Sequence, residues 1–284
     1  MTRVLMISSF TATSHVGSVV SAFVLRRMGI DVTVLPTTLF GRHPGWGSPG
    51  GNIVPSSQLE DMWDAVQTQS REQGLPFDAV MTGYMGETGH VELAETIIRT
   101  LNPPLVLVDP VMGDGSRARE GLYIDADRAE AICDRLIPLA NIATPNLWEW
   151  RFMTGNLSED DPIPPRPLTG INETLVTSVT SGPQIGAMLF EAGRTHTIMH
   201  DRFQGVPNGG GDALAAAYLG HRLSGTPPRE AMGRAVSAIF AVMQAANAAD
   251  AGELPLIRAQ HFLQSAATGA HDDAAPNLTI KTTP

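Results

Sequence analysis

The sequence predicts an α/β fold of three layers, in which helices cover both faces of a mostly parallel central sheet. Apolar runs of strand length alternate with amphipathic stretches of helical length over most of the chain, as in repeated βαβ units. Two adjacent apolar runs at 186–193 and 194–201 predict an antiparallel hairpin at the edge of that sheet. The 43% hydrophobic and 17% charged residues are typical of a globular chain. We expect a single domain over residues 1–265.

The first predicted strand, at 3–9, reads RVLMISS and is apolar enough to be buried on both faces. A helix over 16–29 follows it and ends at Gly29. Further strands are expected at 31–37, 77–83, 104–110, 141–145 and 173–179. Further helices are expected at 56–73, 89–101, 126–138, 146–154, 211–224 and 227–248. The last of these begins beside Pro227 and Pro228, because proline suits the first turn of a helix.

Three stretches interrupt the alternation. Residues 40–51, FGRHPGWGSPGG, hold too much glycine and proline for a helix, and a loop of this kind beside strand ends is a candidate lid over a site. Residues 157–170 are expected to form a surface linker. We expect the tail, residues 266–284, to be loosely ordered.

The charge and cysteine content exclude several classes of protein. The net charge is −10 and the basic residues are scattered, so we expect no nucleic-acid partner. No run approaches the roughly 18 apolar residues of a membrane span, and the apolar run at the N-terminus is too short for a signal peptide, so a cytoplasmic location is expected. Cys133 is the only cysteine, which excludes an internal disulfide and the usual thiolate zinc sites.

Lysine is almost absent. Lys281 is the only lysine of the chain and stands close to its end. The sequence therefore has no G-x-x-x-x-G-K-[ST] phosphate-binding loop, no protein-kinase strand lysine and no plausible Schiff-base lysine. These absences argue against a Walker-type nucleotide hydrolase and against an enzyme with pyridoxal phosphate as its cofactor.

Three glycines precede an aspartate at the start of an alanine-rich helix, in VPNGGGDALAAAYLG (206–220). Glycines allow backbone N–H groups to point at an anion, and the helix N-terminus adds its partial positive charge. An aspartate placed there, Asp212, could accept the proton of a hydroxyl that attacks a phosphoryl group. Alternatively, Asn208 or Asp212 only caps the helix.

Further carboxylates follow other predicted strands. Asp109 ends the strand in LVLVDPVMGDG, and Asp114 lies in the glycine-rich loop after it. Two carboxylates with phosphate oxygens and water suit Mg²⁺, although a D-G pair is also a common turn. Glu149 stands near the start of another helix, where it could equally favour the positive end of the helix dipole.

Taken in order, these motifs resemble the pyridoxal kinase branch of the ribokinase-like superfamily, from about residue 3 to about residue 250. The motifs are a strand that ends in Ser9, HVGS (15–18), the LFGRHPGW loop, TGY (82–84), DPVMGD (109–114), TPNLWE (144–149), VTS (176–178) and GGGD (209–212). The resemblance implies a ribokinase-like α/β/α fold and a homodimer. It also implies transfer of the ATP γ-phosphoryl group to the 5′-hydroxymethyl of pyridoxal, and of pyridoxine and pyridoxamine as further candidates, with Mg²⁺ and a candidate monovalent cation such as K⁺.

The resemblance also implies a role for each matching residue. Asp212 would be the catalytic base, and the anion hole would be Gly209, Gly210 and Gly211. The nucleotide would be bound by Asp109, Tyr123, Thr144, Glu149, Thr177 and Ser178, with Asp114 and Glu149 at the metal. The vitamin pocket would comprise Ser9, Val16, Phe40, His43, Tyr84 and Asp212.

The sequence departs from the family pattern at three positions. Gly210 stands where threonine or valine is usual, and Ser18 where asparagine is usual. Pro44 follows the lid histidine where the family has threonine, so a hydroxyl near the pyridine ring is missing and the preferred vitamer stays open.

Three alternatives remain open at this stage. A hydroxymethylpyrimidine kinase of the same superfamily would share the chemistry, but its usual G-G-A-G run near the first strand is absent. A B6-binding protein without turnover is disfavoured by the intact Asp212, Asp114 and Glu149. An oxidoreductase with a dinucleotide cofactor is disfavoured because no G-x-G-x-x-G precedes the first helix.

Overall fold

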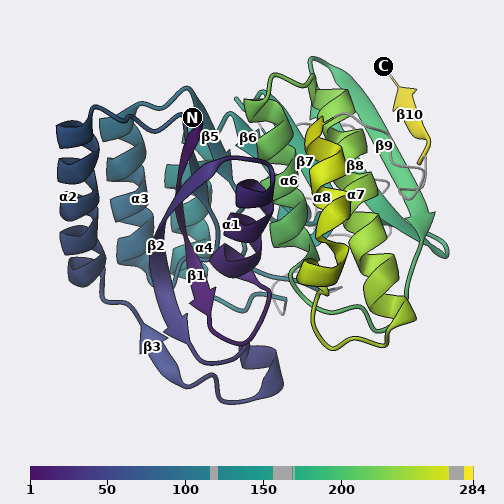
Figure 1. Cartoon of the computed structure of the whole chain (residues 1–284), viewed down its shortest axis with the longest axis horizontal. Coiled ribbons are helices and arrows are strands. Elements are labelled where there is room, and N and C mark those ends of the chain that lie inside the picture. Colours follow the sequence, from purple (N-terminus) through teal and green to yellow (C-terminus); the bar gives the residue numbers. More distant parts are fainter. Residues whose placement is uncertain (116–120, 156–167, 169, 269–277, 284) are drawn as a thin grey trace.

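The core of the protein is a single ten-stranded sheet in the part of the chain that the computed structural model describes, residues 1–115, 121–155, 168, 170–268 and 278–283. Figure 1 shows it between layers of helices. Its strands are β1 (Arg3–Thr11), β2 (Asp31–Phe40), β3 (Gly51–Ile53), β4 (Ala79–Thr82), β5 (Leu105–Val108), β6 (Ile142–Ala143), β7 (Glu173–Ser181), β8 (Gln184–Glu191), β9 (Arg194–Asp201) and β10 (Ile280–Thr283). Their spatial order is β10-β9-β8-β7-β6-β5-β4-β1-β2-β3.

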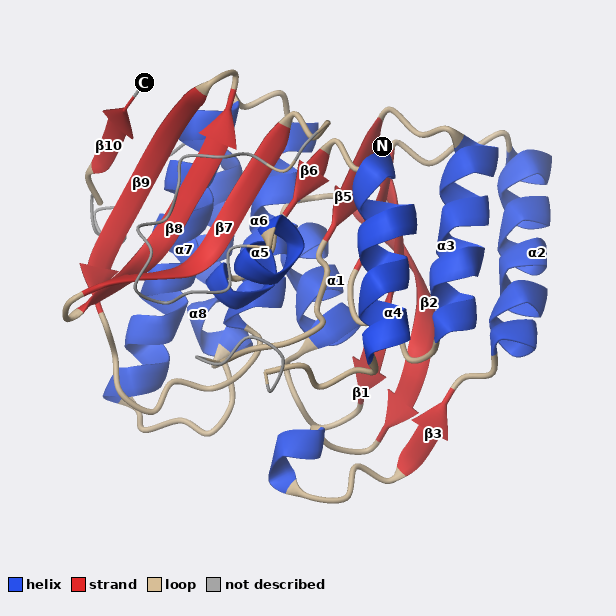
Figure 2. Cartoon of the chain, turned by 180° about the vertical axis from the view of Figure 1, so that it is seen from behind, coloured by secondary structure: helices blue, strands red, loops and turns tan. Residues whose placement is uncertain are grey.

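The helices divide between the two faces of the sheet, as Figures 1 and 2 show from opposite sides. They are α1 (Gly17–Arg27), α2 (Ser56–Gln73), α3 (Thr88–Leu101), α4 (Ala126–Ala131), α5 (Leu147–Thr154), α6 (Gly210–Leu223), α7 (Pro228–Ala248) and α8 (Leu256–Thr268). Helix α4 continues into a π turn over Ile132–Leu136 and a 3₁₀ turn over Ile137–Leu139. Helices α1, α6, α7 and α8 cover one face, and α2 to α5 cover the other.

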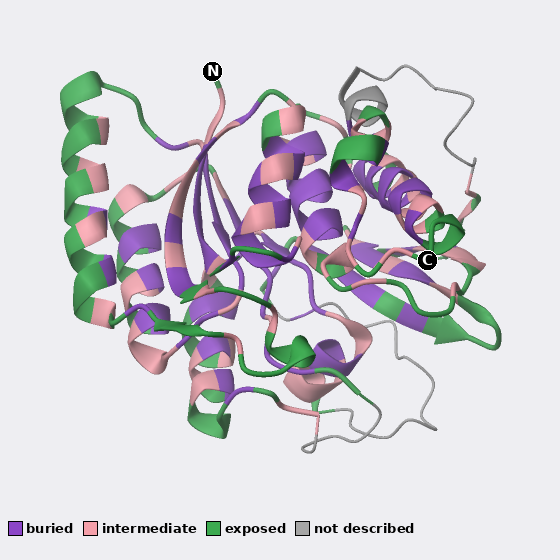
Figure 3. Cartoon of the chain, turned by 60° about the horizontal axis from the view of Figure 1, so that its bottom comes forward, coloured by how far each residue is buried: buried purple, intermediate pink, exposed green. Residues whose placement is uncertain are grey.

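Strand β1 shows why both faces carry helices. Successive side chains of a strand point to opposite faces, so Val4 and Met6 pack into the core under α1 and α6, whereas Leu5 and Ile7 pack into the core under α2 and α3. All four side chains have no exposed surface. The outer helix α2 buries mainly Leu59 and Trp63 and leaves its outward face exposed, as Figure 3 shows. The predicted three-layer fold is confirmed.

The direction of the strands follows the length of their connections. Strands β2, β1, β4, β5, β6 and β7 are parallel neighbours, joined across helices. Strands β8 and β9 form the predicted antiparallel hairpin, and β8 is also antiparallel to β7. The hairpin is not the edge of the sheet, however, because β10 pairs antiparallel to β9 outside it.

The expectation that residues 266–284 are loosely ordered is wrong for part of this segment. Helix α8 extends to Thr268, and Ile280–Thr283 forms β10 on the open edge of β9. Pairing satisfies backbone groups that an edge strand would otherwise leave to water. Residues 269–277 and 284 lie outside the described residues, as do 156–167 and 169 of the predicted linker. The division of the chain at residue 265 therefore stays a prediction.

The candidate lid is an excursion between two paired strands. It contains one 3₁₀ turn, Pro44–Trp46, and returns as the short strand β3, antiparallel to β2. Strand β3 and helix α8 were not predicted from the sequence. Among the described residues, no helix is both long and apolar enough to cross a membrane.

His221 of α6 gives a prediction about stability. Its side chain is almost fully buried, and burial, together with the nearby Arg234, lowers its pKa from 6.5 to about 4. As pH falls below 6.5 the unfolded chain gains a proton on this imidazole, whereas the folded chain does not until about pH 4, so stability decreases through this window. Between pH 7 and pH 5 this histidine should cost roughly 2 kcal/mol of unfolding free energy. Urea denaturation at both pH values should show a weaker pH dependence in His221→Leu, and an equal pH dependence in variant and wild type would contradict this expectation.

Candidate active site

The residues singled out in the sequence gather at the carboxyl edge of the parallel strands, beside the N-terminus of α6. Asp212 lies in the first turn of that helix, partly buried. The Ser21 hydroxyl of α1 donates to the Asp212 backbone carbonyl at 3.2 Å, which joins the two helix starts. Burial raises the pKa of the Asp212 carboxyl to about 6, and the Gly17 N–H, which donates to it, opposes that rise.

The glycine turn before Asp212 has a conformation that requires glycine at its first position. Gly209 has φ +95°, and a Cβ there would lie 2.0 Å from the His15 carbonyl oxygen. A Cβ at Gly210 would lie 2.1 Å from the Met243 methyl group, whereas one at Gly211 would meet open space. The turn therefore packs tightly behind the helix start and leaves the position beside Asp212 accessible.

Asp109, Glu149 and Asp212 form an acidic group. Asp109 follows β5, is buried, and its backbone N–H donates to Thr82 O at 3.0 Å. Its pKa lies well above the usual range because burial disfavours the charge, and because the charges of Asp212 and Glu149 add to that effect. The nearby Thr144 hydroxyl acts in the opposite direction. Buried carboxylates whose charges oppose one another favour the binding of a cation or a proton.

Glu149 is fixed by a capping box at the start of α5. Asn146 Oδ1 accepts from Glu149 N at 2.9 Å, while Glu149 Oε2 accepts from Asn146 N at 2.8 Å. Its other oxygen, Oε1, accepts from Met112 N at 2.8 Å, so the side chain also holds the loop that follows β5. Burial raises its pKa to about 7 although these backbone donors lower it. Glu149 thus lies in the first turn of α5, where its charge can favour the positive end of the helix dipole, and it also belongs to the acidic group.

Asp114 and Tyr123 lie on either side of the undescribed residues 116–120. Asp114 is exposed, and its backbone N–H donates to Gly121 O at 2.9 Å. Tyr123 N donates to Met112 O at 3.2 Å, which places the tyrosine beside the loop that Glu149 holds. The side chain of Tyr123 is exposed.

A bulge in β7 presents Thr177 and Ser178. The pairing with β8 shifts register between Val176 and Val179, and Ser178 has φ +56°. Thr177 N donates to Pro145 O at 2.8 Å, so the bulge lies beside the end of β6, where Thr144 is found. The four predicted nucleotide-side positions Thr144, Glu149, Thr177 and Ser178 therefore come from two adjacent strand ends and the helix between them.

The predicted vitamin-pocket residues come from three other strand ends. Ser9 of β1 packs against Gly17, because a Cβ at Gly17 would lie 2.3 Å from Ser9 Oγ, and Val16 is the buried residue that precedes α1. Since Gly17 also donates to Asp212, Ser9, Val16 and Asp212 are brought together. Phe40 ends β2 and Tyr84 follows β4. His43 lies in the lid, where its Nδ1 accepts from Gly45 N at 3.1 Å, inside its own turn.

Gly17 is a site residue whose role the sequence reasoning missed. It has φ +56°, it contacts Ser9, and it donates to the proposed base. The motif HVGS was noticed, but nothing in its spacing indicates that the glycine faces Asp212, almost 200 residues away in the chain. His15, two residues before Gly17, is also held by residues distant in the sequence. Its Nδ1 lies 2.6 Å from Leu254 O, and its backbone N–H donates to Glu253 Oε2 at 2.9 Å.

Comparison with known proteins places this arrangement in a family. A family model described as phosphomethylpyrimidine kinase matches residues 55–256. A pyridoxal kinase of Rubrobacter xylanophilus is 30% identical over 289 residues, which cover 92% of this chain and 93% of the relative. The chain belongs to the pyridoxal kinase family. Its membership confirms the resemblance drawn from the ordered motifs.

Solved pyridoxal kinases share the fold at low identity. The enzyme of Entamoeba histolytica superposes with a TM-score of 0.85 at 22% identity and covers 100% of both chains. The enzyme of Staphylococcus aureus, solved in complex with AMP-PCP and pyridoxal, has a TM-score of 0.75 at 17% identity, with 100% of this chain and 98% of that chain covered. These structures share the three-layer α/β/α architecture of this chain, with its mostly parallel central sheet.

Proposed function

We propose that this pyridoxal kinase transfers the γ-phosphoryl group of ATP to the 5′-hydroxymethyl group of pyridoxal. The observation that carries the proposal is the Asp212 carboxyl, held at the N-terminus of α6 behind a glycine turn, with its pKa raised to about 6. A base with a pKa near the working pH is deprotonated enough to act and basic enough to accept a hydroxyl proton. Membership of the family and the acidic group around Asp109 support the same reaction.

In the proposed reaction, Asp212 accepts the proton of the 5′-hydroxyl group of pyridoxal while the oxygen of that hydroxyl group forms a bond to the γ-phosphorus of ATP. The bond between that phosphorus and the β–γ bridging oxygen breaks, and ADP leaves with the electron pair. The N–H groups of Gly209, Gly210 and Gly211 lie at the positive end of α6, where they would stabilise the charge on the transferred group. Because the chain offers no lysine near this position, backbone donors and a metal ion have to supply the stabilisation.

The acidic group fits Mg²⁺ bound jointly with the triphosphate. The donors are hard carboxylate oxygens. Burial, with neighbouring negative charges as a smaller cause, raises the pKa of both Asp109 and Glu149, so a bound cation would favour their charged forms. Within the described part of the chain no three acidic or imidazole groups form a metal cage, which agrees with a cation that takes most of its ligands from phosphate and water. When bound, Mg²⁺ would neutralise the phosphate charge. Exposed Asp114 suits direct ligation, and Glu149, whose oxygens already accept N–H bonds, suits contact through water.

The remaining predicted residues divide between the two substrates. We assign Asp109, Tyr123, Thr144, Glu149, Thr177 and Ser178 to the nucleotide side and Ser9, Val16, Phe40, His43, Tyr84 and Asp212 to the vitamin side. In addition, the family resemblance leads us to propose a homodimer, a cytoplasmic location and assistance by a monovalent cation such as K⁺. Size-exclusion chromatography with light scattering tests the first of these, and turnover in KCl against choline chloride tests the last.

A second candidate substrate is hydroxymethylpyrimidine, because the matching family model is described as phosphomethylpyrimidine kinase. One steady-state comparison separates the candidates: ADP release is followed with pyridoxal, pyridoxine, pyridoxamine and hydroxymethylpyrimidine, each with Mg²⁺ and after chelation by EDTA. We expect the highest kcat/KM with pyridoxal and no turnover without the metal. A higher kcat/KM with hydroxymethylpyrimidine would reject the pyridoxal assignment, and binding of pyridoxal without ADP release would reject kinase activity.

A further inference from the structure

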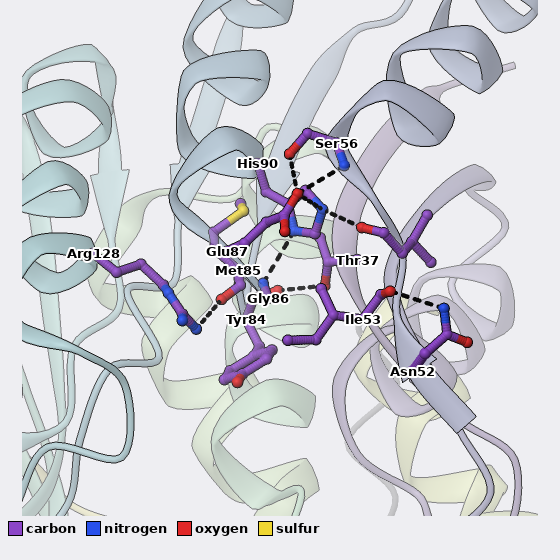
Figure 4. Close-up of polar contacts among 11 residues, drawn as sticks. Thr37, Asn52, Ile53, Ser56, Tyr84, Met85, Gly86, Glu87, His90 and Arg128 are labelled. Atoms are coloured by element: carbon purple, nitrogen blue, oxygen red, sulfur yellow. Dashed lines mark hydrogen bonds and ion pairs between the residues drawn. The ribbon is translucent and has the colours of Figure 1, made fainter. Parts of the chain in front are cut away.

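The backbone that follows β4 is held by side chains from three different elements, which Figure 4 shows together. Thr37 Oγ1 of β2 donates to Tyr84 O at 2.7 Å, and Arg128 Nη1 of α4 donates to Met85 O at 3.2 Å. Gly86 N donates to Nδ1 of His90 in α3 at 3.1 Å. Two consecutive peptide groups, Tyr84–Met85 and Met85–Gly86, are therefore fixed from outside their own turn.

His90 uses both of its ring nitrogens in this arrangement. The imidazole has no exposed surface, and Nε2 lies 2.7 Å from Val54 O. Because Nδ1 accepts the Gly86 N–H, the proton of the neutral ring has to be on Nε2, which donates to Val54. Burial lowers the His90 pKa, which favours this neutral form. A side chain that satisfies one buried donor and one buried acceptor is costly to remove.

The second partner of His90, Val54, lies directly after the strand in which the lid returns to the sheet, and we call Val54 the lid base. Val54 directly follows β3, and its backbone N–H donates to Thr37 O at 3.0 Å. The next turn is held as well, since Ser56 N donates to Glu87 Oε1 at 2.7 Å. Thr37 and His90 thus each contact both Val54 and the 84–86 turn. Figure 4 shows Thr37 beside Tyr84 and His90 beside Gly86. The two segments cannot shift independently while these bonds are intact.

Glycine at position 86 makes this junction close. A Cβ there would lie 2.8 Å from the Ile53 side chain, 3.0 Å from Thr37 O and 3.2 Å from the His90 ring. The return strand of the lid, the end of β2 and the start of α3 therefore converge on one peptide. The direction in which Tyr84 leaves the sheet is set by that convergence.

We propose that His90 is a positioning residue for the vitamin side of the site, which it serves by joining the lid base at Val54 to the turn that carries Tyr84. The inference rests on the proposed pyridoxal kinase activity. The hydrogen bonds of the His90 ring go to protein backbone, and the Glu87 carboxylate lies 3.8 Å from its Nε2. His90 would therefore act through Tyr84 and the lid without contacting a reacting atom. Four of the proposed nucleotide-side residues lie on the other side of β5 from this junction, on or beside β6, β7 and α5: Thr144, Glu149, Thr177 and Ser178. Of the other two, Asp109 follows β5 itself and Tyr123 lies before α4.

Separate measurement of KM for the two substrates tests the proposal. His90→Leu removes both hydrogen bonds and fills the same buried space with an apolar side chain of similar size. We expect it to raise KM for pyridoxal by about 5- to 30-fold, the effect of losing one or two buried hydrogen bonds, with KM for ATP changed by less than about 2-fold. His90→Asn can still present an oxygen to Gly86 N–H, so it should restore part of the affinity for pyridoxal.

His221→Leu is the matched control, because it also replaces a buried imidazole but lies far along α6 from Asp212. It should leave both KM values unchanged. If circular dichroism shows that His90→Leu does not fold, Thr37→Val tests the proposal in its place. This variant removes only the hydrogen bond from the Thr37 hydroxyl to Tyr84 O and should also raise KM for pyridoxal. An unchanged KM for pyridoxal, or an equal rise of both KM values, overturns the inference. The wild type is assayed first. If it does not turn over pyridoxal, the proposed function has failed, and that result is distinct from a failure of the inference about His90.

Discussion

Replacement of Asp212 by asparagine is expected to lower kcat with pyridoxal by roughly 10²-fold or more, as loss of a general base typically does. Asparagine keeps the shape of the side chain at the start of α6 but cannot accept the substrate proton. KM for ATP should stay within a few-fold of wild type, because the nucleotide-side residues lie on other elements. Asp127→Asn is the matched control, since Asp127 also lies in the first turn of a helix, α4, but is exposed and outside the acidic group.

The pH dependence of the wild type provides an independent check on Asp212. Only the deprotonated carboxylate can accept a proton, so kcat/KM should fall about tenfold per pH unit below the pKa of about 6 and level off above it. Asp109 and Glu149 titrate in the same group, so the acidic limb belongs to the coupled set. The residual activity of Asp212→Asn should lack most of this limb. Near-normal turnover in Asp212→Asn, or an unaltered acidic limb, would show that another group is the base.

Replacement of Gly209 by alanine should have the second large effect, a loss of roughly 10²- to 10³-fold in kcat, the range seen when an oxyanion donor is lost. At φ +95° an L-residue is strained by about 1–2 kcal/mol. Its Cβ would also lie 2.0 Å from the His15 carbonyl, so the turn or the His15 segment has to move. That movement would displace the N–H groups that we propose to stabilise the transferred phosphoryl group.

Gly225→Ala is the control that separates the effect of backbone strain from the effect of displacing the glycine turn. Gly225 follows the other end of α6 and has φ +81°, but a Cβ there meets nothing within 4 Å. Both variants should lose stability in thermal unfolding because of the strained φ, with a larger loss in Gly209→Ala from the added clash, and Gly225→Ala should keep its kcat. If Gly209→Ala retained wild-type kcat, the glycine turn would not be the anion hole.

The sequence predicted the main elements of the fold well where local patterns are strong. Helix α2 spans Ser56–Gln73 as expected, and the hairpin of β8 and β9 was found from its two apolar runs. Strand β3 is three exposed residues long and has no pattern of its own. Strand β10 forms only because β9 offers an open edge far away in the sequence. Helix α8 does carry a periodic signal, in Leu256, Ala259 and Leu263, which was overlooked.

The candidate site was predicted in part. Asp109, Glu149 and Asp212 were named from motifs that stand directly after predicted strands or glycines, and the structure brings them into one electrostatic group. The supporting contacts could not be predicted, because they join residues that only the fold brings together, such as Gly17 with Asp212 and Thr37 with Tyr84. The roles assigned to the individual site residues stay predictions until the variants are measured.

The position of β10 has a consequence for an enzyme that handles aldehydes. Pyridoxal and its phosphate condense readily with amines, and a lysine beside the site would be exposed to repeated imine formation by substrate and product. The only lysine, Lys281, lies on the outermost strand of the sheet, paired with Thr197, and β9, β8, β7 and β6 separate it from Asp109 at the end of β5. The chain thus keeps its single side-chain amine away from the aldehyde it is proposed to phosphorylate, and product can leave without being captured by the protein that made it.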